Sequence, residues 1–356
     1  MTKKLLHIVE KVRQRQRLSV EEAEILWTEG DLLLLGLLAQ EVRKAMHGDD
    51  TVTFVIDRNI NYTNVCTVGC RFCAFYKNPD QEGAYLLRHE EIFQKIEETL
   101  AVGGTQILMQ GGIHPDLSLE YYEDLLKAIK KRYIIHIHSF SPPEIFSMAE
   151  KSGLSIDKTL CRLKEAGLDS IPGGGAEILD DRVRAIISPR KIGWQRWMEV
   201  MQSAHRQGLK TTATMMFGSV ETLQERLYHL ERLRQGQDET GGFTAFIPWS
   251  FQPTYTELGG KTATGVEYLK TLALSRVFLD NIPNIQASWV TQGSKMAQVA
   301  LAFGANDFGG TMLEENVVRA TGIRYRVPLD EILHCIRETG KKPVQRDTLY
   351  RALRAF

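Results

Sequence analysis

The stretch TFVIDRNINYTNVCTVGCRFCAFYKN, residues 53–78, joins a short apolar run to a loop that contains three cysteines. The run at 53–57 has the length and composition of a buried strand. Cys66, Cys70 and Cys73 follow it at once. If further strand and helix units come after this one, the cysteines lie at the carboxyl end of the first strand of a larger α/β fold.

Such units recur to residue 310, each beginning with an apolar run that ends at a glycine, a proline or a polar break. Their alternation over roughly 250 residues predicts an α/β fold, namely a (β/α)8 TIM-type barrel. The expected strands are 53–57, 106–109, 134–138, 170–172, 211–216, 244–248, 285–289 and 307–309. The expected helices are 90–102, 119–131, 156–165, 195–207, 223–233, 266–279 and 295–303.

Helical segments are expected on both sides of this barrel. Residues 19–46 place apolar side chains at helical spacing, and Ser19 with Glu22 matches a capping box. A last helix is expected at 329–338. The chain therefore divides into an N-terminal helical cap (1–50), a barrel (51–315) and a C-terminal helical appendage (316–356).

The composition is that of an ordinary globular protein. Of the 356 residues, 43% are hydrophobic and 25% charged, and Lys plus Arg balances Asp plus Glu at 44 each. No net charge therefore favours a nucleic acid or a membrane surface as a partner. There is no apolar run of about 18 residues, and the five cysteines do not resemble a secreted disulfide framework. We expect a cytoplasmic protein that acts on a small molecule.

The cysteine spacing CxxxCxxC predicts an iron–sulfur cluster with one open position. A [4Fe-4S] cluster has four irons, so ligation by Cys66, Cys70 and Cys73 leaves one iron free for a substrate or cofactor atom. Zinc is the alternative, but structural zinc sites have four ligands. Cys161 and Cys335 lie in apolar helical patterns and are expected to be buried, inert thiols.

With the aromatic Phe72 before the third cysteine, this motif resembles that of the radical S-adenosylmethionine (SAM) superfamily. The resemblance implies a [4Fe-4S] cluster on the three cysteines and SAM chelated to the free iron. Reductive cleavage of SAM then yields methionine and a 5′-deoxyadenosyl radical. An electron donor such as flavodoxin or ferredoxin is implied as a partner. The protein positions the cofactors and excludes water.

The loops after the later strands supply further cofactor-binding candidates. Gly111 and Gly112, in MQGGIHP, permit close approach to the backbone, where the family binds the methionine amino group. Glu177, beyond three glycines, matches a glutamate that contacts SAM in the relatives. The alternatives are a tight turn for the glycines and a helix start for Glu177. Further cofactor-binding candidates are Phe72 itself, Arg190 or Arg196 as a carboxylate partner, and Met216 against the adenine, although methionines usually pack in cores.

The third strand ends in HIHSFSPPE. His136 and His138 share one face and Ser139 takes the other, so only one set points into the barrel. Ser139, nearer the mouth, is our choice for the ligand side. Ser141 and Glu144 predict the capping box of the next helix and are expected to be structural.

For two further features the sequence permits either a functional or a structural role. Trp249 and Trp289, at the ends of two expected strands, form either an aromatic wall around a substrate ring or ordinary packing. Asp307, expected at the mouth beside Glu314 and Glu315, is the candidate catalytic base. Its alternative role is to cap the following turn.

From about Thr53 to Glu338 the chain resembles one subgroup of the superfamily. The subgroup includes dehypoxanthine futalosine cyclases, aminofutalosine synthases and the second subunit of deazaflavin-ring synthesis. The resemblance is carried by NYTNVC, CAFY, QGGIHP, SFSPPE, ASWVTQG and GANDFGGTMLEEN. CAFY and WVTQG are most similar to the cyclases.

The resemblance to the cyclases implies cyclisation of dehypoxanthine futalosine in the futalosine route to menaquinone. The radical would take hydrogen from the ribose C4′, and the resulting carbon radical would add to the benzoate ring. Loss of one proton and one electron then restores aromaticity. The sibling reactions are the alternatives, and an iron–sulfur electron carrier is a more distant one.

Overall fold

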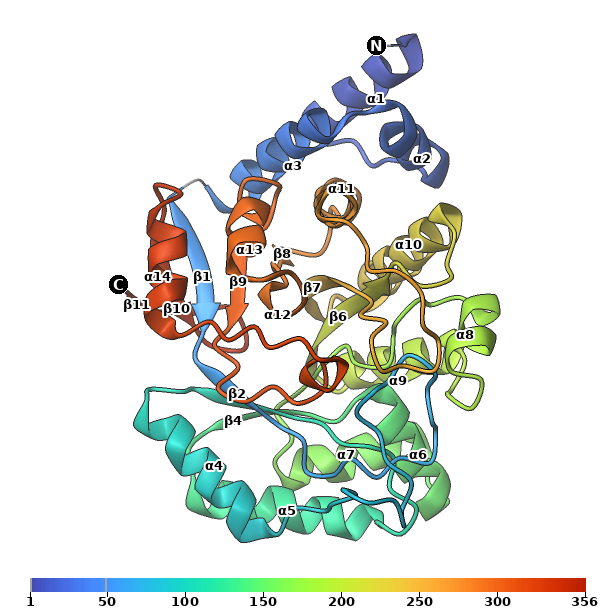
Figure 1. Ribbon diagram of the computed structural model, residues 1–356, viewed down its shortest axis with the longest axis vertical. Coiled ribbons are helices and arrows are strands. Elements are labelled where there is room, and N and C mark those ends of the chain that lie inside the picture. Colours follow the sequence, from blue (N-terminus) through green and yellow to red (C-terminus); the bar gives the residue numbers. More distant parts are fainter. Residues whose placement is uncertain (1, 49) are drawn as a thin grey trace.

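The computed structural model describes residues 2–48 and 50–356 and contains a barrel of parallel strands surrounded by helices (Figure 1). Its main sheet has seven strands, each parallel to its neighbours. In order they are β2 (Asp57–Ile60), β3 (Gln106–Met109), β4 (His136–Ser139), β5 (Ser170–Ile171), β6 (Lys210–Phe217), β7 (Phe243–Ser250) and β8 (Asn284–Ile285).

Two more strands connect the ends of this sheet. β1 (Thr51–Val55) leads into β2 after a single residue and pairs in parallel with β9 (Asp307–Gly310). An isolated parallel bridge joins Gln286, just after β8, to Asp307. The first expected strand is therefore two short strands, and the predicted TIM-type barrel is confirmed.

Helices cover the outside of the barrel, mostly where the sequence predicts them (Figure 1). They are α4 (His89–Ala101), α5 (Leu119–Arg132), α6 (Pro142–Ser152), α7 (Ile156–Ala166), α8 (Asp181–Ile187), α9 (Trp194–Arg206), α10 (Leu223–Thr240), α11 (Gly265–Phe278) and α13 (Ser294–Ala300). A short helix, α12 (Trp289–Gln292), follows β8 and lies inside this layer (Figure 1). The expected strand 285–289 is wrong at its end, because the backbone N–H of Ser288 donates to the Tyr268 hydroxyl and Trp289 begins α12.

The N-terminal cap consists of α1 (Lys3–Arg13), α2 (Val20–Glu29) and α3 (Leu32–His47), and α3 packs against α11. The capping box of Ser19 and Glu22 is confirmed. The single helical stretch that the sequence predicts is divided after Gly30, because the Asp31 side chain accepts from the Leu34 N–H and begins a new helix.

The C-terminal part contains the expected helix, α14 (Leu329–Arg337), after a short 3-10 turn at Arg319–Thr321. It also contains two strands that the sequence does not predict. β10 (Lys342–Arg346) pairs in parallel with β1, and β11 (Ala352–Ala355) pairs antiparallel with β10. Their short, charged sequences lack a clear alternation, and β10, on which β11 depends for pairing, has its own partner β1 almost 300 residues away in the chain. The division at 50/51 and 315/316 stays a prediction.

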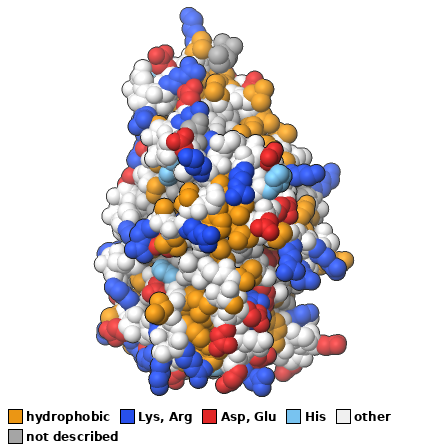
Figure 2. Space-filling view, turned by 90° about the vertical axis from the view of Figure 1, so that its left-hand side faces the viewer, with side chains coloured by type: hydrophobic (Ala, Val, Ile, Leu, Met, Phe, Trp, Pro, Cys, Tyr) orange, Lys and Arg blue, Asp and Glu red, His pale blue; other side chains and the backbone are white. Residues whose placement is uncertain are grey.

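The surface carries no strong charge of one sign on the face shown in Figure 2, where basic and acidic side chains are intermixed. This agrees with the balance of charges in the sequence. Within residues 2–48 and 50–356, no helix is both long enough and apolar enough to cross a membrane.

Candidate active site

A cavity of about 280 Å³ lies inside the barrel. Its wall follows the two-residue period of the strands, because every second side chain of a barrel strand points inward. The inward side chains come from several strands and from Asn61, which directly follows β2. They are Asp57 and Asn59 from β2, Gln106 and Leu108 from β3, His138 from β4, Thr212 and Thr214 from β6, and Ile247 and Trp249 from β7. Active sites of such barrels lie at the carboxyl ends of the strands.

The cysteine loop follows β2, at the carboxyl end of the barrel strands, as the sequence predicts. Cys70 is buried, Cys66 and Cys73 are half-buried, and all three are free thiols. The loop is held by its own backbone, since the N–H of Cys66 donates to the Lys77 carbonyl and that of Cys73 to the Cys70 carbonyl, both at 3.0 Å. The three thiols are therefore presented on an ordered loop.

The donor set fits an iron–sulfur cluster with an open iron. Within the described ranges, no three His, Cys, Asp or Glu side chains are grouped to hold a single metal ion. A cluster spreads its ligands over separate irons, so it does not require such a group. Burial raises the pKa of Cys70 to about 12 and that of Cys73 above its usual value. The positive charge of bound iron would stabilise the thiolates.

Glycines bring the neighbouring loops against the cysteine loop. A Cβ atom on Gly112 would lie 2.2 Å from the carbonyl oxygen of Val65 and 2.7 Å from the Cβ atom of Cys66. Gly111 donates its N–H to Glu144 at 3.1 Å, and a Cβ atom on it would lie 2.5 Å from the Tyr62 ring. Gly111 and Gly112 are thus required by packing around the cysteine loop.

The capping box of Ser141 and Glu144 is also confirmed. The buried Glu144 carboxylate accepts hydrogen bonds from the Ser141 N–H and hydroxyl, from the Tyr62 hydroxyl and from the Gly111 N–H. It connects the start of α6 to the cysteine loop and to the loop after β3.

Glu177 lines the cavity and is buried beside two cations. Each of its carboxylate oxygens lies 3.2 Å from Lys191 Nζ, and Arg184 Nη1 lies 3.8 Å from one of them. Its φ of 38° is in the left-handed region, where a residue with a side chain is strained. A strained carboxylate on a cavity wall next to three glycines is typical of a ligand-binding position.

Lys191 is a site residue that sequence reasoning missed. Its ammonium contacts Glu177 and lies 5.0 Å from the centroid of the Phe72 ring. Although burial opposes its charge, Cys70 and Glu177 raise the pKa of Lys191. The signal for Lys191 in the sequence is its place next to Arg190, which the sequence offers, with Arg196, as a carboxylate partner.

The two arginines of that region do not line the cavity. Arg190 is exposed and donates from Nε to the Val68 carbonyl at 2.9 Å, so it braces the cysteine loop from outside. Arg196 is exposed on α9 and pairs with Glu199 one turn away. Met216 is fully buried, and its N–H donates to the Glu177 carbonyl at 3.0 Å.

The inward face of β4 is the opposite of the expected one. His138 lines the cavity, whereas Ser139 is fully buried and donates its hydroxyl to the Met109 carbonyl at 2.7 Å. The physical reason is register, because His138 pairs with Leu108, which faces inward.

The expected position of Asp307 at the mouth is wrong. Asp307 begins β9, so the mouth end of that strand is Gly310. The Asp307 carboxylate is fully buried, forms a bidentate pair with Arg346 at 2.5 and 3.0 Å, and accepts from the Thr53 hydroxyl at 2.5 Å. It does not line the cavity, whereas Glu315 does.

The unpredicted strand β10 and the loop after it supply one end of the cavity, here called the floor: Arg346, Thr348 and Tyr350. The Arg346 guanidinium lies 3.8 Å from the centroid of the Tyr350 ring. Asp57 also lines the cavity, and it accepts from the Met312 N–H at 2.9 Å and from the Gln106 amide at 3.1 Å.

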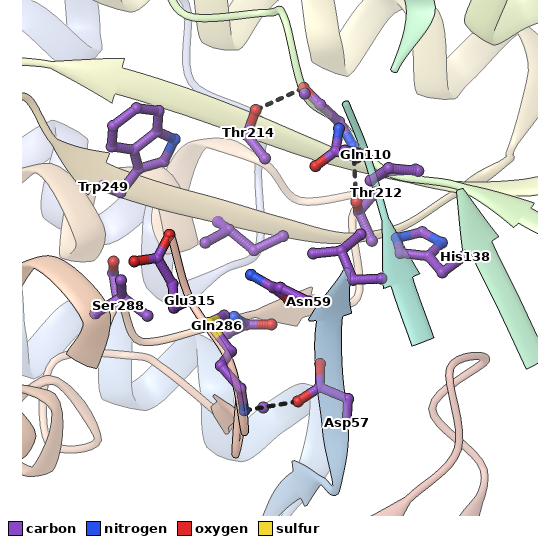
Figure 3. A pocket seen from close by; sticks show the side chains of 18 of the residues that line it. Asp57, Asn59, Gln110, His138, Thr212, Thr214, Trp249, Gln286, Ser288 and Glu315 are labelled. Atoms are coloured by element: carbon purple, nitrogen blue, oxygen red, sulfur yellow. Dashed lines mark hydrogen bonds between the residues drawn. The ribbon is translucent and has the colours of Figure 1, made fainter. Parts of the chain in front are cut away.

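Aromatic and amide groups lie in the centre of the cavity. Figure 3 shows Asn59 projecting into it, with Trp249 and Glu315 on one side and His138 on the other. Among the described residues, Asn59 Oδ1 is a buried oxygen with no hydrogen-bond partner. Trp289 lines the wall and donates from its ring to the Gly310 carbonyl at 2.8 Å. An unsatisfied amide oxygen in a polar cavity indicates a place for a ligand's donor group.

The two other cysteines differ from each other. Cys335 is buried, as expected. The prediction for Cys161 is wrong, since it lies on the exposed side of α7, where its thiol donates to Glu165.

Two family models and several named relatives match most of the chain. A model of the Radical SAM superfamily matches residues 60–233, and a model of the CofH/MqnC C-terminal region matches residues 240–355. The chain is 49% identical over 351 residues to a protein of Halalkalibacterium halodurans named cyclic dehypoxanthine futalosine synthase, covering 98% of this chain and 95% of that protein.

Another named relative carries a different activity. The 5-amino-6-(D-ribitylamino)uracil–L-tyrosine 4-hydroxyphenyl transferase of Methanothermobacter thermautotrophicus is 44% identical over 332 residues, covering 91% of this chain and 90% of that protein. Among solved structures, methylornithine synthase has a TM-score of 0.74 at 18% identity, covering 94% of this chain and 97% of that chain. That likeness supports the fold.

Proposed function

This chain belongs to the radical SAM superfamily, in the family of the CofH/MqnC C-terminal region, and from that premise we propose that it is a cyclic dehypoxanthine futalosine synthase. Its substrate would be dehypoxanthine futalosine and its product the cyclic form, in the futalosine route to menaquinone. The observation that carries this proposal is the full-length similarity to the Halalkalibacterium enzyme of that name, which exceeds the similarity to the transferases.

The cofactors follow from membership of the radical SAM superfamily, and residues at the mouth are available to hold them. Cys66, Cys70 and Cys73 would hold the [4Fe-4S] cluster, and Glu177 would contact SAM. When bound, the two cofactors supply a carbon radical that takes a hydrogen atom from an unactivated C–H bond. Reduction by flavodoxin or ferredoxin fits the general need of the superfamily for a one-electron donor.

The other predicted cofactor-binding residues would act mainly by holding the cysteine loop and Glu177 in place. Gly111, Gly112 and Arg190 brace the cysteine loop, and Met216 fixes the backbone of Glu177. Phe72 lies under the Lys191 ammonium. Ser139 and Arg196 have no contact with the cavity in this structure, so an indirect effect on binding is all that we assign to them.

The cavity fits a substrate that carries an aromatic ring and a ribose. Trp249 and Trp289 offer aromatic surface on one wall, and the amides of Asn59 and Gln110 offer hydrogen bonds. Arg346 is the only lysine or arginine among the described lining residues, and it is the candidate partner for the benzoate carboxylate. These side chains would hold the reacting carbons together and keep other hydrogen donors out.

The test is an anaerobic assay of the reconstituted protein with reductant, SAM and dehypoxanthine futalosine, followed by mass spectrometry. We expect 5′-deoxyadenosine together with a product two hydrogens lighter than the substrate. SAM cleavage without loss of the futalosine would contradict the proposal.

The transferase activity of the archaeal relatives is the second candidate, because their similarity also extends over most of the chain. A parallel assay with 5-amino-6-(D-ribitylamino)uracil and tyrosine separates the two. Coupled product from these substrates alone would assign this protein to the transferases.

A further inference from the structure

His136 and His138 of β4 and Ser170 of β5 form a row of hydrogen bonds that has no role in the function proposed above. His138 Nδ1 lies 2.7 Å from Ser170 Oγ, and Ser170 Oγ lies 2.7 Å from His136 Nε2. Ser170 pairs with His138 across the two strands, so the sheet itself fixes the contact. The row begins at the cavity wall with His138 and ends at His136, which is half-buried.

The position of the three residues gives the row a direction. His138 lies on the wall of the cavity, as Figure 3 shows. His136 begins β4, at the end of the barrel opposite to the cysteine loop. Burial lowers the pKa of His136, although the charges of Asp169 and Asp347 oppose that shift, so His136 is neutral and can accept a proton at one ring nitrogen while it releases one from the other. A proton that enters at His138 can therefore leave the barrel at the end far from the cofactors.

A hydroxyl group has one proton, so Ser170 can donate a hydrogen bond to only one of the two histidines at a time. When Ser170 donates to His136 Nε2, it must accept from His138 Nδ1–H. His138 Nε2 then carries a lone pair. Among the described residues, the hydrogen bond of the His138 ring is formed by Nδ1, and His138 lines the cavity. The lone pair is thus available to a group in the cavity.

The environment of His138 prevents it from keeping a proton. Burial, with the charges of His136 and Arg346, lowers the pKa of His138 to about 3. An imidazole that accepts a proton in this place must release another at once, and Ser170 is the acceptor within reach.

The carboxylates in the cavity wall are less suited to this task. Asp57 already accepts from the Met312 N–H and the Gln106 amide. Glu315 accepts from the N–H groups of Val317 and Val318. Both are held in place by these bonds, and among the described residues no hydrogen bond joins either carboxylate to a second proton carrier. Of the three side chains compared, His138 is the one that combines a free acceptor with an exit.

We propose that His138, Ser170 and His136 form a relay that removes from the cavity the proton lost when the substrate ring regains aromaticity. This proposal rests on the proposed cyclisation. The ring C–H bond breaks, its electron pair stays in the ring, and its proton bonds to His138 Nε2. The Nδ1 proton of His138 moves to Ser170, the Ser170 proton moves to His136 Nε2, and the Nδ1 proton of His136 passes to water.

One electron also leaves the ring, to a one-electron acceptor of the iron–sulfur class. The relay returns to its first state by exchange with water after the product has left. His138 is the catalytic residue in this scheme, because it meets the substrate. Ser170 and His136 are positioning residues that act through it.

The experiment compares wild-type protein with His138→Gln, Ser170→Ala and His136→Phe in anaerobic single turnovers. It measures 5′-deoxyadenosine, cyclic product and the solvent deuterium isotope effect on product formation. In His138→Gln we expect 5′-deoxyadenosine at close to the wild-type rate and cyclic product lower by about 10²- to 10⁴-fold, the range for loss of a general base. Exogenous imidazole should restore part of the product in His138→Ala.

Ser170→Ala and His136→Phe should show a smaller loss and a reduced solvent isotope effect, because fewer protons move together. Ser275→Ala is the matched control, since it removes a buried serine hydroxyl that only bonds to the Thr271 carbonyl inside α11. It should behave as the wild type. Cluster content and thermal melting identify any variant that fails to fold.

Each result has a separate meaning. Wild-type coupling of product to 5′-deoxyadenosine in His138→Gln would overturn the relay and leave the cyclase assignment intact. So would an unchanged solvent isotope effect in Ser170→Ala. A wild-type protein that forms no cyclic product would instead overturn the proposed function, and the relay with it.

Discussion

Two buried carboxylates, Glu177 at the mouth and Asp307 near the floor, are both paired with cations but in different ways. Asp307 has a bidentate partner in Arg346 and two further donors, and it has no face in the cavity. Glu177 has longer contacts, a strained backbone and a place in the cavity wall. A saturated carboxylate stabilises a fold, whereas a loosely held one has capacity left for a ligand.

The largest effect is expected from Cys70→Ala at the mouth. Loss of one thiolate removes a cluster ligand, so iron content and SAM cleavage should be abolished while the barrel stays folded. Iron and sulfide analysis after anaerobic reconstitution, with 5′-deoxyadenosine formation, provides the measurement. Cys161→Ala is the matched control, since this thiol is exposed on α7 and should be dispensable. Full cleavage activity in Cys70→Ala would refute the ligand assignment.

At the floor, Asp307→Asn should act on stability. The change leaves Arg346 buried without its carboxylate partner, which typically costs about 3–5 kcal/mol of unfolding free energy. Urea denaturation measures the change. The variant should keep SAM cleavage at temperatures where it is folded. A stable Asp307→Asn protein that cleaves SAM but makes no product would contradict a purely structural role for Asp307 and would place the loss at Arg346, the proposed partner of the benzoate.

Glu177→Gln should act on cofactor binding, with a smaller loss of stability than Asp307→Asn because its contacts with Lys191 and Arg184 are longer. Loss of a charge-assisted hydrogen bond is worth about 1.5–3 kcal/mol, so we expect the KM for SAM to rise roughly 10- to 100-fold. The same kinetic assay on Glu199→Gln, an exposed partner of Arg196, should give wild-type values. An unchanged KM in Glu177→Gln would mean that the two carboxylates have the same structural role.

The smallest effect is expected from Glu225→Gln. Glu225 of α10 forms an ion pair with Arg182 of α8. The hydrogen bond from Arg182 lowers the pKa of Glu225 from 4.5 to about 2. Because the folded pKa is the lower one, the contribution to stability is present above about pH 4.5 and is lost as the pH falls toward 2. Glu225→Gln should cost at most about 1 kcal/mol at pH 7.

The difference between Glu225→Gln and wild type should shrink as denaturation is repeated down to pH 3. A difference independent of pH would assign the loss to the capping box with Thr222 instead.

The local parts of the fold could be predicted from the sequence. The strand at 106–109 and the helix starts at Ser19 and Ser141 depend on residues close together in the chain, and they are where the pattern places them. The end of the seventh strand could not be predicted, because a hydroxyl from α11, Tyr268, decides it. The split of the first strand depends likewise on β9 and β10.

In the site, too, local features could be predicted and features that depend on distant contacts could not. The sequence predicted the cysteine loop and the position of Glu177 after its glycines, because each of these features lies within a single loop. Asp307 was misplaced and Lys191 overlooked, because their roles depend on partners elsewhere in the chain, namely Arg346 for the first and Glu177 and Phe72 for the second.

The sequence by itself determined the family and the barrel and placed the three cysteines of the proposed cluster on one loop, because periodicity and short spacings are local properties of the chain. Only the tertiary structure decided which face of β4 looks inward, which carboxylate is saturated and that the C-terminal strand carries Arg346 to the floor. Those features are contacts between distant segments, and their register is set by the packing of the whole barrel.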